Sequence, residues 1–168
     1  MINKNPNPDT GPVFTNGQPV RYTGAFKAWG RVANHVPDRF ERVTARWEVP
    51  RGEWSPRHER VCRYSLAAAP DDFVVWLAAV PKELQKARDF RWALDGVSDA
   101  LDRGTIRTGN GCIVETLRAF RAMEYRKTSK AIERWLAAQP DREPDYPEWL
   151  VPKGWTPPIR RGKVPRLV

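Results

Sequence analysis

The chain has 168 residues, of which 40% are hydrophobic and 29% charged, and its formal net charge is +9 with a sequence pI near 10.0. A body of this length buries about 70% of the surface that its unfolded chain exposes, so a single domain can form a core without disulfides or metals. No run approaches 18 apolar residues, the first residues lack an apolar signal segment, and only two cysteines occur. These features argue against membrane and secreted classes and predict a cytoplasmic protein.

Proline divides the chain into three parts. Residues 1–20 contain four prolines beside several Asn and Gly residues, which predicts an extended or disordered N-terminal arm. From Pro140 onward, seven of 29 residues are proline, a density that forbids regular helix and favours polyproline II. We therefore predict extended proline-rich arms at residues 1–20 and 140–168 around a folded body at 21–139.

The first third of the body is ambiguous between helix and strand. Phe26, Trp29 and Val32 recur at helical spacing, and Pro37-Asp38 could open a second helix. A strand over residues 40–50 is the alternative. Further along, Ser55-Pro56 places a capping residue before a proline and indicates another helix start.

The later segments read more clearly as helices. Pro70-Asp71-Asp72 precedes the most apolar window of the chain and predicts a core helix, and Pro81 opens the longest periodic segment, which ends at Gly104. Over residues 105–115, a β-hairpin and the start of a helix at 112–125 remain alternatives. Thr128-Ser129 caps a last helix, in which Ile132, Trp135 and Leu136 face inward.

The fold class predicted from these segments is mainly α. We expect a small helical domain of about five to six helices between the two proline-rich arms, with one short β-hairpin near residues 105–115 as an alternative.

Two basic helical faces form the first candidate site. Each face repeats at helical spacing, and side chains three or four residues apart on a helix are neighbours. Together the two faces could follow a phosphate backbone, although a solvated helix surface is an equally good reading. The residues are Arg118, Arg121 and Tyr125 on one helix and Lys127, Lys130 and Arg134 on the next.

A second candidate site is an arginine cluster within residues 39–63, in which Trp47 and Trp54 are interleaved. Arg beside Trp suits a groove for single-stranded nucleic acid, where charges follow the backbone and rings stack on bases. The candidate contacts are Arg42, Arg46, Arg57 and Arg60. However, the same segment contains four glutamates whose spacing allows ion pairs with these arginines. Such ion pairs would neutralise about half of the cluster.

The proline-rich C-terminal arm carries a third set of candidates. Trp149 and Trp155, with Arg160 and Arg161, would let a stiff extended arm dock at a small entropic penalty. The arm could bind a groove on its own body or on a protein partner, and we favour the partner. Trp76, Trp92 and Trp135 occupy periodic apolar positions and are expected in the core instead.

The signals for an enzyme are weak. His58 and Cys62, with His35 and Cys112, lack the paired spacing of a zinc site, and no nucleophile elbow, P-loop or dinucleotide fingerprint occurs. We assign no catalytic residue, metal ligand or cofactor.

The first functional hypothesis is a small, basic, non-enzymatic protein that binds DNA or RNA by contacting the phosphate backbone through Arg/Lys helix faces. The alternative is a protein-interaction or structural subunit that wraps a partner with its Trp/Pro-rich arm, either as an assembly component or as an inhibitor of a nucleic-acid-processing complex. Neither hypothesis involves a membrane.

Overall fold

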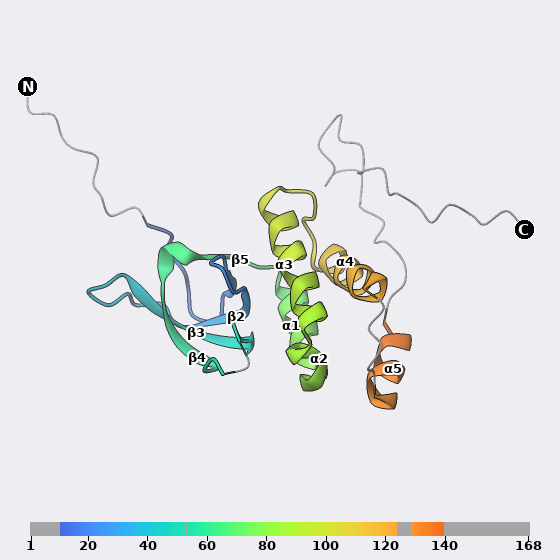
Figure 1. The fold of residues 1–168 in the computed structure, drawn as a ribbon. Coiled ribbons are helices and arrows are strands. Elements are labelled where there is room, and N and C mark those ends of the chain that lie inside the picture. The colour runs from blue at the N-terminus through green and yellow to red at the C-terminus, as the bar shows by residue number, and fades with distance from the viewer. Residues whose placement is uncertain (1–10, 53, 124–128, 140–168) are drawn as a thin grey trace, which may run out of the picture.

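The structure is a computed structural model that describes residues 11–52, 54–123 and 129–139. A five-stranded antiparallel sheet is formed by the first half of the chain and helices by the second (Figure 1). The prediction of a mainly helical domain is therefore wrong, because the chain has an α/β fold.

The sheet has the strand order β4-β3-β2-β1-β5. Its two edge strands are joined by only three residues, Arg63–Ser65, which form a 3-10 turn. A flat sheet of five strands would hold its edges about 19 Å apart, whereas the four Cα steps of this connection span at most about 14 Å. The sheet must therefore curl on itself. The strands are β1 (Pro19–Tyr22), β2 (Ala28–Asn34), β3 (Arg42–Val49), β4 (His58–Cys62) and β5 (Leu66–Ala68).

Strand β3 shows why the helical reading of the first third fails. Val43, Ala45 and Trp47 are buried, while Thr44 and Arg46 between them are not. This period of two marks a strand with one buried face. The helices expected after Pro37 and at Ser55-Pro56 are replaced by β3 and β4, and the one expected around Phe26 and Trp29 by β2, so the strand alternative over residues 40–50 is confirmed.

The helices follow the later predictions more closely. The core helix after Pro70 is present, and the periodic segment from Pro81 to Gly104 forms two helices separated at Ala87. Thr108 caps the next helix by accepting from the Gly111 N–H at 3.1 Å, so a helix rather than a hairpin occupies this segment. The helices are α1 (Asp71–Ala79), α2 (Lys82–Lys86), α3 (Arg88–Asp102), α4 (Gly109–Ala122) and α5 (Lys130–Ala137), and Ser129 caps α5 as predicted.

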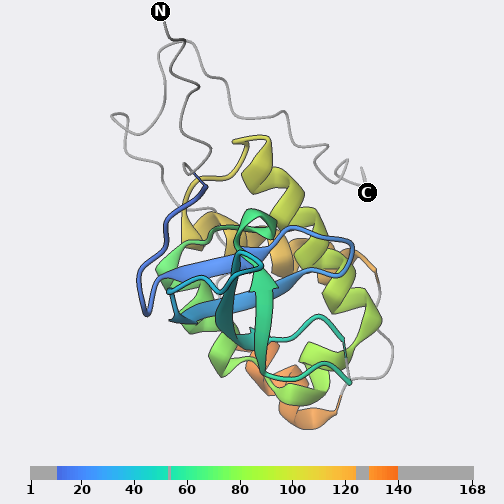
Figure 2. The same ribbon diagram turned by 90° about the vertical axis from the view of Figure 1, so that its left-hand side faces the viewer.

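Two hydrophobic cores meet at Trp29. One lies inside the curled sheet and includes Val32, Val43 and Trp47, and the other lies among the helices. Trp29 of β2 belongs to the helical core and meets the Phe73 ring of α1 edge-on, with 5.0 Å between the ring centroids. Figure 2, viewed from the sheet side, shows the strands in front of the helices.

Arginines fix the sheet against the helices. The buried Arg21 of β1 donates to the Ser98 hydroxyl at 2.7 Å and pairs with Asp102 at 2.5 Å, both on α3. This hydrogen bond lowers the pKa of Asp102. Arg31 of β2 pairs with Asp71 of α1 at 2.6 Å. Part of the arginine excess therefore has a structural use.

Residues 11–20, within the predicted N-terminal arm, already belong in part to the folded body. Phe14 is buried in the core of the sheet, and β1 begins at Pro19. In the described segments, no helix combines the length and the apolar character needed to cross a membrane.

Candidate nucleic-acid interface

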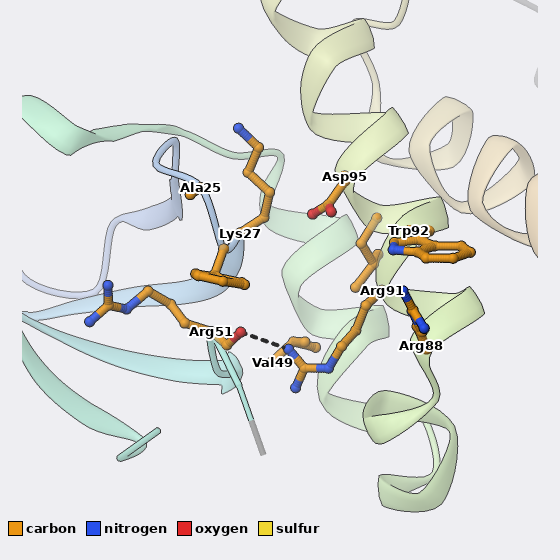
Figure 3. Close-up of a pocket in the computed structure, with 10 residues that line it drawn as sticks. Ala25, Lys27, Val49, Arg51, Arg88, Arg91, Trp92 and Asp95 are labelled. Atoms are coloured by element: carbon orange, nitrogen blue, oxygen red, sulfur yellow. Dashed lines mark hydrogen bonds between the residues drawn. The ribbon is translucent and has the colours of Figure 1, made fainter. Parts of the chain in front are cut away.

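A pocket of about 380 Å³ lies where the sheet meets α3 (Figure 3). This volume is within the range of about 300–1,000 Å³ that is usual for small-molecule sites. The loop between β1 and β2, the end of β3 with the residues after it, and α3 all contribute to its wall. The residues are Ala25, Phe26, Lys27, Val49, Arg51, Arg88, Arg91, Trp92, Leu94 and Asp95, and we call this the junction pocket.

Helix α3 supplies one wall of the junction pocket. Arg88, Arg91, Trp92 and Asp95 stand at i, i+3, i+4 and i+7, a spacing that brings them to one helical face. The Arg88 guanidinium lies over the Trp92 ring, 4.5 Å from its centroid, in a cation–π contact. The Trp92 side chain nevertheless remains 50% exposed.

The sheet supplies the opposite wall (Figure 3). The Lys27 ammonium donates to the Thr23 carbonyl at 2.9 Å, within the loop between β1 and β2. Arg51 follows β3, where its guanidinium pairs with Glu59 and lies over the Tyr22 ring. The Lys27 side chain thus stays at this wall, whereas the Arg51 guanidinium points away from α3 and the main-chain carbonyl of Arg51 faces Arg91 (Figure 3).

Arg91 connects the two walls. Its guanidinium donates to the main-chain carbonyls of Pro50 and Arg51, both at 3.0 Å (Figure 3). Because Pro50 and Arg51 begin the loop between β3 and β4, this contact fixes that loop against α3. The shape of the junction pocket is therefore defined by hydrogen bonds between the sheet and the helix.

The junction pocket is electropositive. Four cationic side chains line it against one carboxylate, Asp95, and Glu59 offsets the charge of Arg51. Neither Lys27 nor Arg88 makes a salt bridge with a carboxylate in the described part of the chain. Burial raises the pKa of Asp95, although Lys27 opposes that shift. Asp95 thus offsets part of the charge of Lys27 and Arg91, but the cations of the lining still outnumber its carboxylates, so the pocket would attract an anionic group.

Exposed aromatic rings accompany this charge. Phe26 is 69% exposed and Trp92 50% exposed, each on its own wall of the junction pocket. Trp54 is 94% exposed and stands three residues beyond Arg51, in a turn where the Ser55 N–H donates to the Gly52 carbonyl at 3.2 Å. Solvent-exposed aromatic side chains beside cationic side chains are typical of surfaces that bind a ligand.

The predicted arginine cluster has a different environment. Arg42 and Arg60 share the carboxylate of Asp38, at 2.9 and 3.6 Å. Desolvation would raise the pKa of Asp38, but the main-chain N–H groups of Arg42 and Phe40 and the Arg42 guanidinium outweigh it and hold the pKa at about 2. The cluster on β3 and β4 is thus tied to carboxylates.

The remaining two members of the cluster also have partners. Arg46 pairs with Glu48 at 3.4 Å, and Arg57 donates to the main-chain carbonyls of Trp47 and Glu48. The expectation that glutamates would neutralise part of this segment is confirmed by the pairs Arg46–Glu48, Arg51–Glu59 and Arg63–Glu41.

The predicted basic helical faces lie elsewhere. Arg118 pairs with Glu115 at 3.2 Å, and Arg121 donates to the Leu136 carbonyl at 3.0 Å, which ties α4 to α5. Lys130 and Arg134 are exposed on α5. Helices α1 to α3 stand between the sheet and the α4–α5 pair, so the two predicted basic groups do not share one surface (Figure 1). Tyr125, Lys127, Trp149, Trp155, Arg160 and Arg161 lie outside the described residues.

Sequence reasoning missed the junction pocket. Trp92 was expected in the core, and that expectation is wrong, whereas Trp76 and Trp135 do pack against the helical core. The usable signal was the run from Arg88 to Asp95, which places cations, a ring and a carboxylate on one helical face. Nothing in the sequence showed that the loop carrying Phe26 and Lys27 would face it.

Groups suited to catalysis are dispersed in the described residues. No three His, Cys, Asp or Glu side chains gather there as a metal site would require. Burial raises the pKa of the Cys112 thiol to about 12, so this side chain stays protonated and is a poor nucleophile.

No known protein family, curated protein or solved structure matches this chain. The junction pocket and the basic surfaces are therefore the grounds on which a function can be inferred.

Proposed function

We propose that this protein binds nucleic acid, without catalysis, through the junction pocket. The observation that carries the proposal is the combination of Lys27, Arg88 and Arg91 with two exposed aromatic rings around one pocket at the boundary of the sheet and α3. Phosphates provide the matching negative charge, and bases provide flat rings for the aromatic side chains.

The distribution of ion pairs favours this pocket over the other basic surfaces. Lys27 and Arg88 form no salt bridge among the described residues, although Asp95 acts on Lys27 from a longer distance, whereas Arg42, Arg46 and Arg60 each form one. A phosphate that approaches the β3–β4 surface must compete with those carboxylates. The exposed Lys130 and Arg134 of α5 are a secondary contact in this proposal, suited to the phosphate backbone alone.

The proposal retains a cytoplasmic location. Cys62 and Cys112 are both free thiols, which suits a reducing compartment.

The test is a fluorescence-anisotropy titration of the full chain with labelled single-stranded and duplex oligonucleotides. With about four phosphate contacts on a single strand, affinity should fall about 50-fold between 50 and 200 mM salt, because bound counterions are released. We expect Lys27→Glu combined with Arg88→Glu to abolish measurable binding.

The matched control is Arg103→Glu combined with Arg107→Glu. These two exposed side chains change the net charge of the chain by the same amount, but they do not line the junction pocket. The control should lose only a small part of the affinity. Absence of binding by the unmodified chain at 50 mM salt, or equal losses in both variants, contradicts the proposal.

A further inference from the structure

We infer that the junction pocket takes the unpaired bases of a single strand, with Trp92 and Phe26 as stacking platforms. This inference rests on the proposed function and narrows it to one class of nucleic acid and one mode of recognition.

The first argument is the exposure of the rings. Trp92 and Phe26 remain 50% and 69% exposed, although Val49 and Leu94 of the same pocket are buried. The pocket thus combines an apolar floor with two open rings. Bases of a duplex are already stacked on each other, so only an unpaired base can cover these rings.

The second argument is the way charge surrounds the rings. Arg88 lies over the Trp92 ring, and Lys27 adjoins Phe26 in the sequence. A base stacked on either ring would place its own phosphate close to a cation that forms no salt bridge among the described residues. Base stacking and phosphate contact would therefore occur together, as they do in the grooves of proteins that bind single strands.

Charge also argues against the chain's own C-terminal segment as the occupant. Aromatic grooves can bind polyproline II segments, and residues 152–168 contain four prolines. The same residues contain five Lys or Arg and no Asp or Glu. Such a segment would bring positive charge to an electropositive pocket, whereas a single strand brings negative charge.

The test compares two oligonucleotides with the same number of phosphates, a 12-residue oligothymidylate and a 12-residue abasic strand. Because one stacked base contributes at least about fivefold in affinity, we expect the oligothymidylate to bind the full chain at least about tenfold more tightly. Binding should also quench tryptophan fluorescence. A 12-base-pair duplex should bind more weakly than the oligothymidylate.

Three variants locate the effect. Trp92→Ala should remove most of the difference between the oligothymidylate and the abasic strand, and Trp92→Phe should keep most of it, since a ring remains. Phe26→Ala should reduce the difference independently. Both substituted positions are exposed in the fold, so circular dichroism and thermal unfolding should remain close to those of the unmodified chain.

The outcomes separate this inference from the proposed function. If the oligothymidylate and the abasic strand bind equally, or if the duplex binds as tightly, the stacking inference is wrong while nucleic-acid binding stands. If Trp92→Ala and Phe26→Ala both fold and both keep the full preference for bases, the location is wrong. If no oligonucleotide binds at all, the proposed function itself fails.

Discussion

The outer surface of β3 and β4 and the junction pocket are both rich in cationic side chains, yet they differ in what those side chains contact. On β3 and β4, Arg42, Arg46 and Arg60 each face a carboxylate. In the junction pocket, Lys27 and Arg88 form no salt bridge in the described segments, Lys27 acts on Asp95 only from a longer distance, and Arg88 lies on an aromatic ring. A count of basic residues is therefore a weaker guide to function than the presence or absence of nearby carboxylates.

The largest expected effect concerns an arginine whose contacts are entirely structural. Arg21→Met removes the hydrogen bonds to Ser98 and the ion pair with Asp102, and leaves Ser98 in a buried site without this donor. Hydrogen bonds that involve a charged group contribute about 1.5–3 kcal/mol each, so we expect a loss of about 2 kcal/mol in the free energy of unfolding.

Chemical denaturation measures this loss, with Arg88→Met as the control. The Arg88 side chain is exposed, and its removal should change the free energy of unfolding by less than about 0.5 kcal/mol. Oligonucleotide affinity should show the opposite order, because Arg88→Met should lose more affinity than Arg21→Met. Similar stability in the two variants would remove the distinction between structural and ligand-facing arginines.

Asp38→Asn should make the β3–β4 surface more like the junction pocket, because its arginines would then have fewer carboxylate partners. The substitution removes the carboxylate shared by Arg42 and Arg60, so we expect oligonucleotide affinity at low salt to rise about threefold through a stronger local field. An unchanged or lower affinity would mean that these arginines do not become available when Asp38 is neutralised.

The same variant has a pH signature. The pKa of Asp38 in the folded chain is about 2, below the ordinary value of 3.8. A lowered pKa means that Asp38 stabilises the fold above about pH 4 and that this contribution disappears as the pH falls toward 2. Urea unfolding between pH 5 and 2 should show a shallower loss of stability in Asp38→Asn. Parallel curves for the two proteins would contradict the hydrogen bonding described for this carboxylate.

Asp95→Asn is expected to have the smallest effect and acts within the junction pocket. Burial raises the pKa of Asp95, so its ionised form destabilises the fold as the pH rises through that pKa. The variant should be as stable as the unmodified chain or more so at pH 7, and should bind an oligonucleotide about twofold to threefold more tightly because one negative charge is removed. Weaker binding would assign Asp95 a direct contact with the ligand.

The parts of the fold that the sequence predicted were those where one periodicity dominates. Proline and acidic residues before Phe73, and Ser129 before Ile132, marked helix starts that the structure contains. The sheet was harder, because Phe26, Trp29 and Val32 recur at a helical spacing. In the structure Phe26 lies in a loop, and Trp29 and Val32 of β2 are buried in different cores, so only pairing with distant residues such as Val49 reveals the strand. Ala87 breaks a helix without any glycine or proline at that position.

The candidate site was less predictable than the fold for a related reason. Local charge and ring patterns identified arginines, but they did not identify carboxylate partners distant in the sequence, such as Asp38 for Arg60. Nor did they place Lys27 opposite Arg88, because that arrangement depends on how Arg21 and Arg91 fix the sheet against α3.

Photochemical cross-linking of the full chain to an oligonucleotide that contains bromodeoxyuridine, followed by peptide mapping, tests the central claim most directly. Bromodeoxyuridine reacts with rings on which it stacks, so no substitution is needed to locate the bound strand. We expect cross-links in the α3 peptide that contains Trp92 and in the β1–β2 loop that contains Phe26. Cross-links confined to β3 and β4 or to α4 and α5 would contradict the assignment of the junction pocket as the nucleic-acid site.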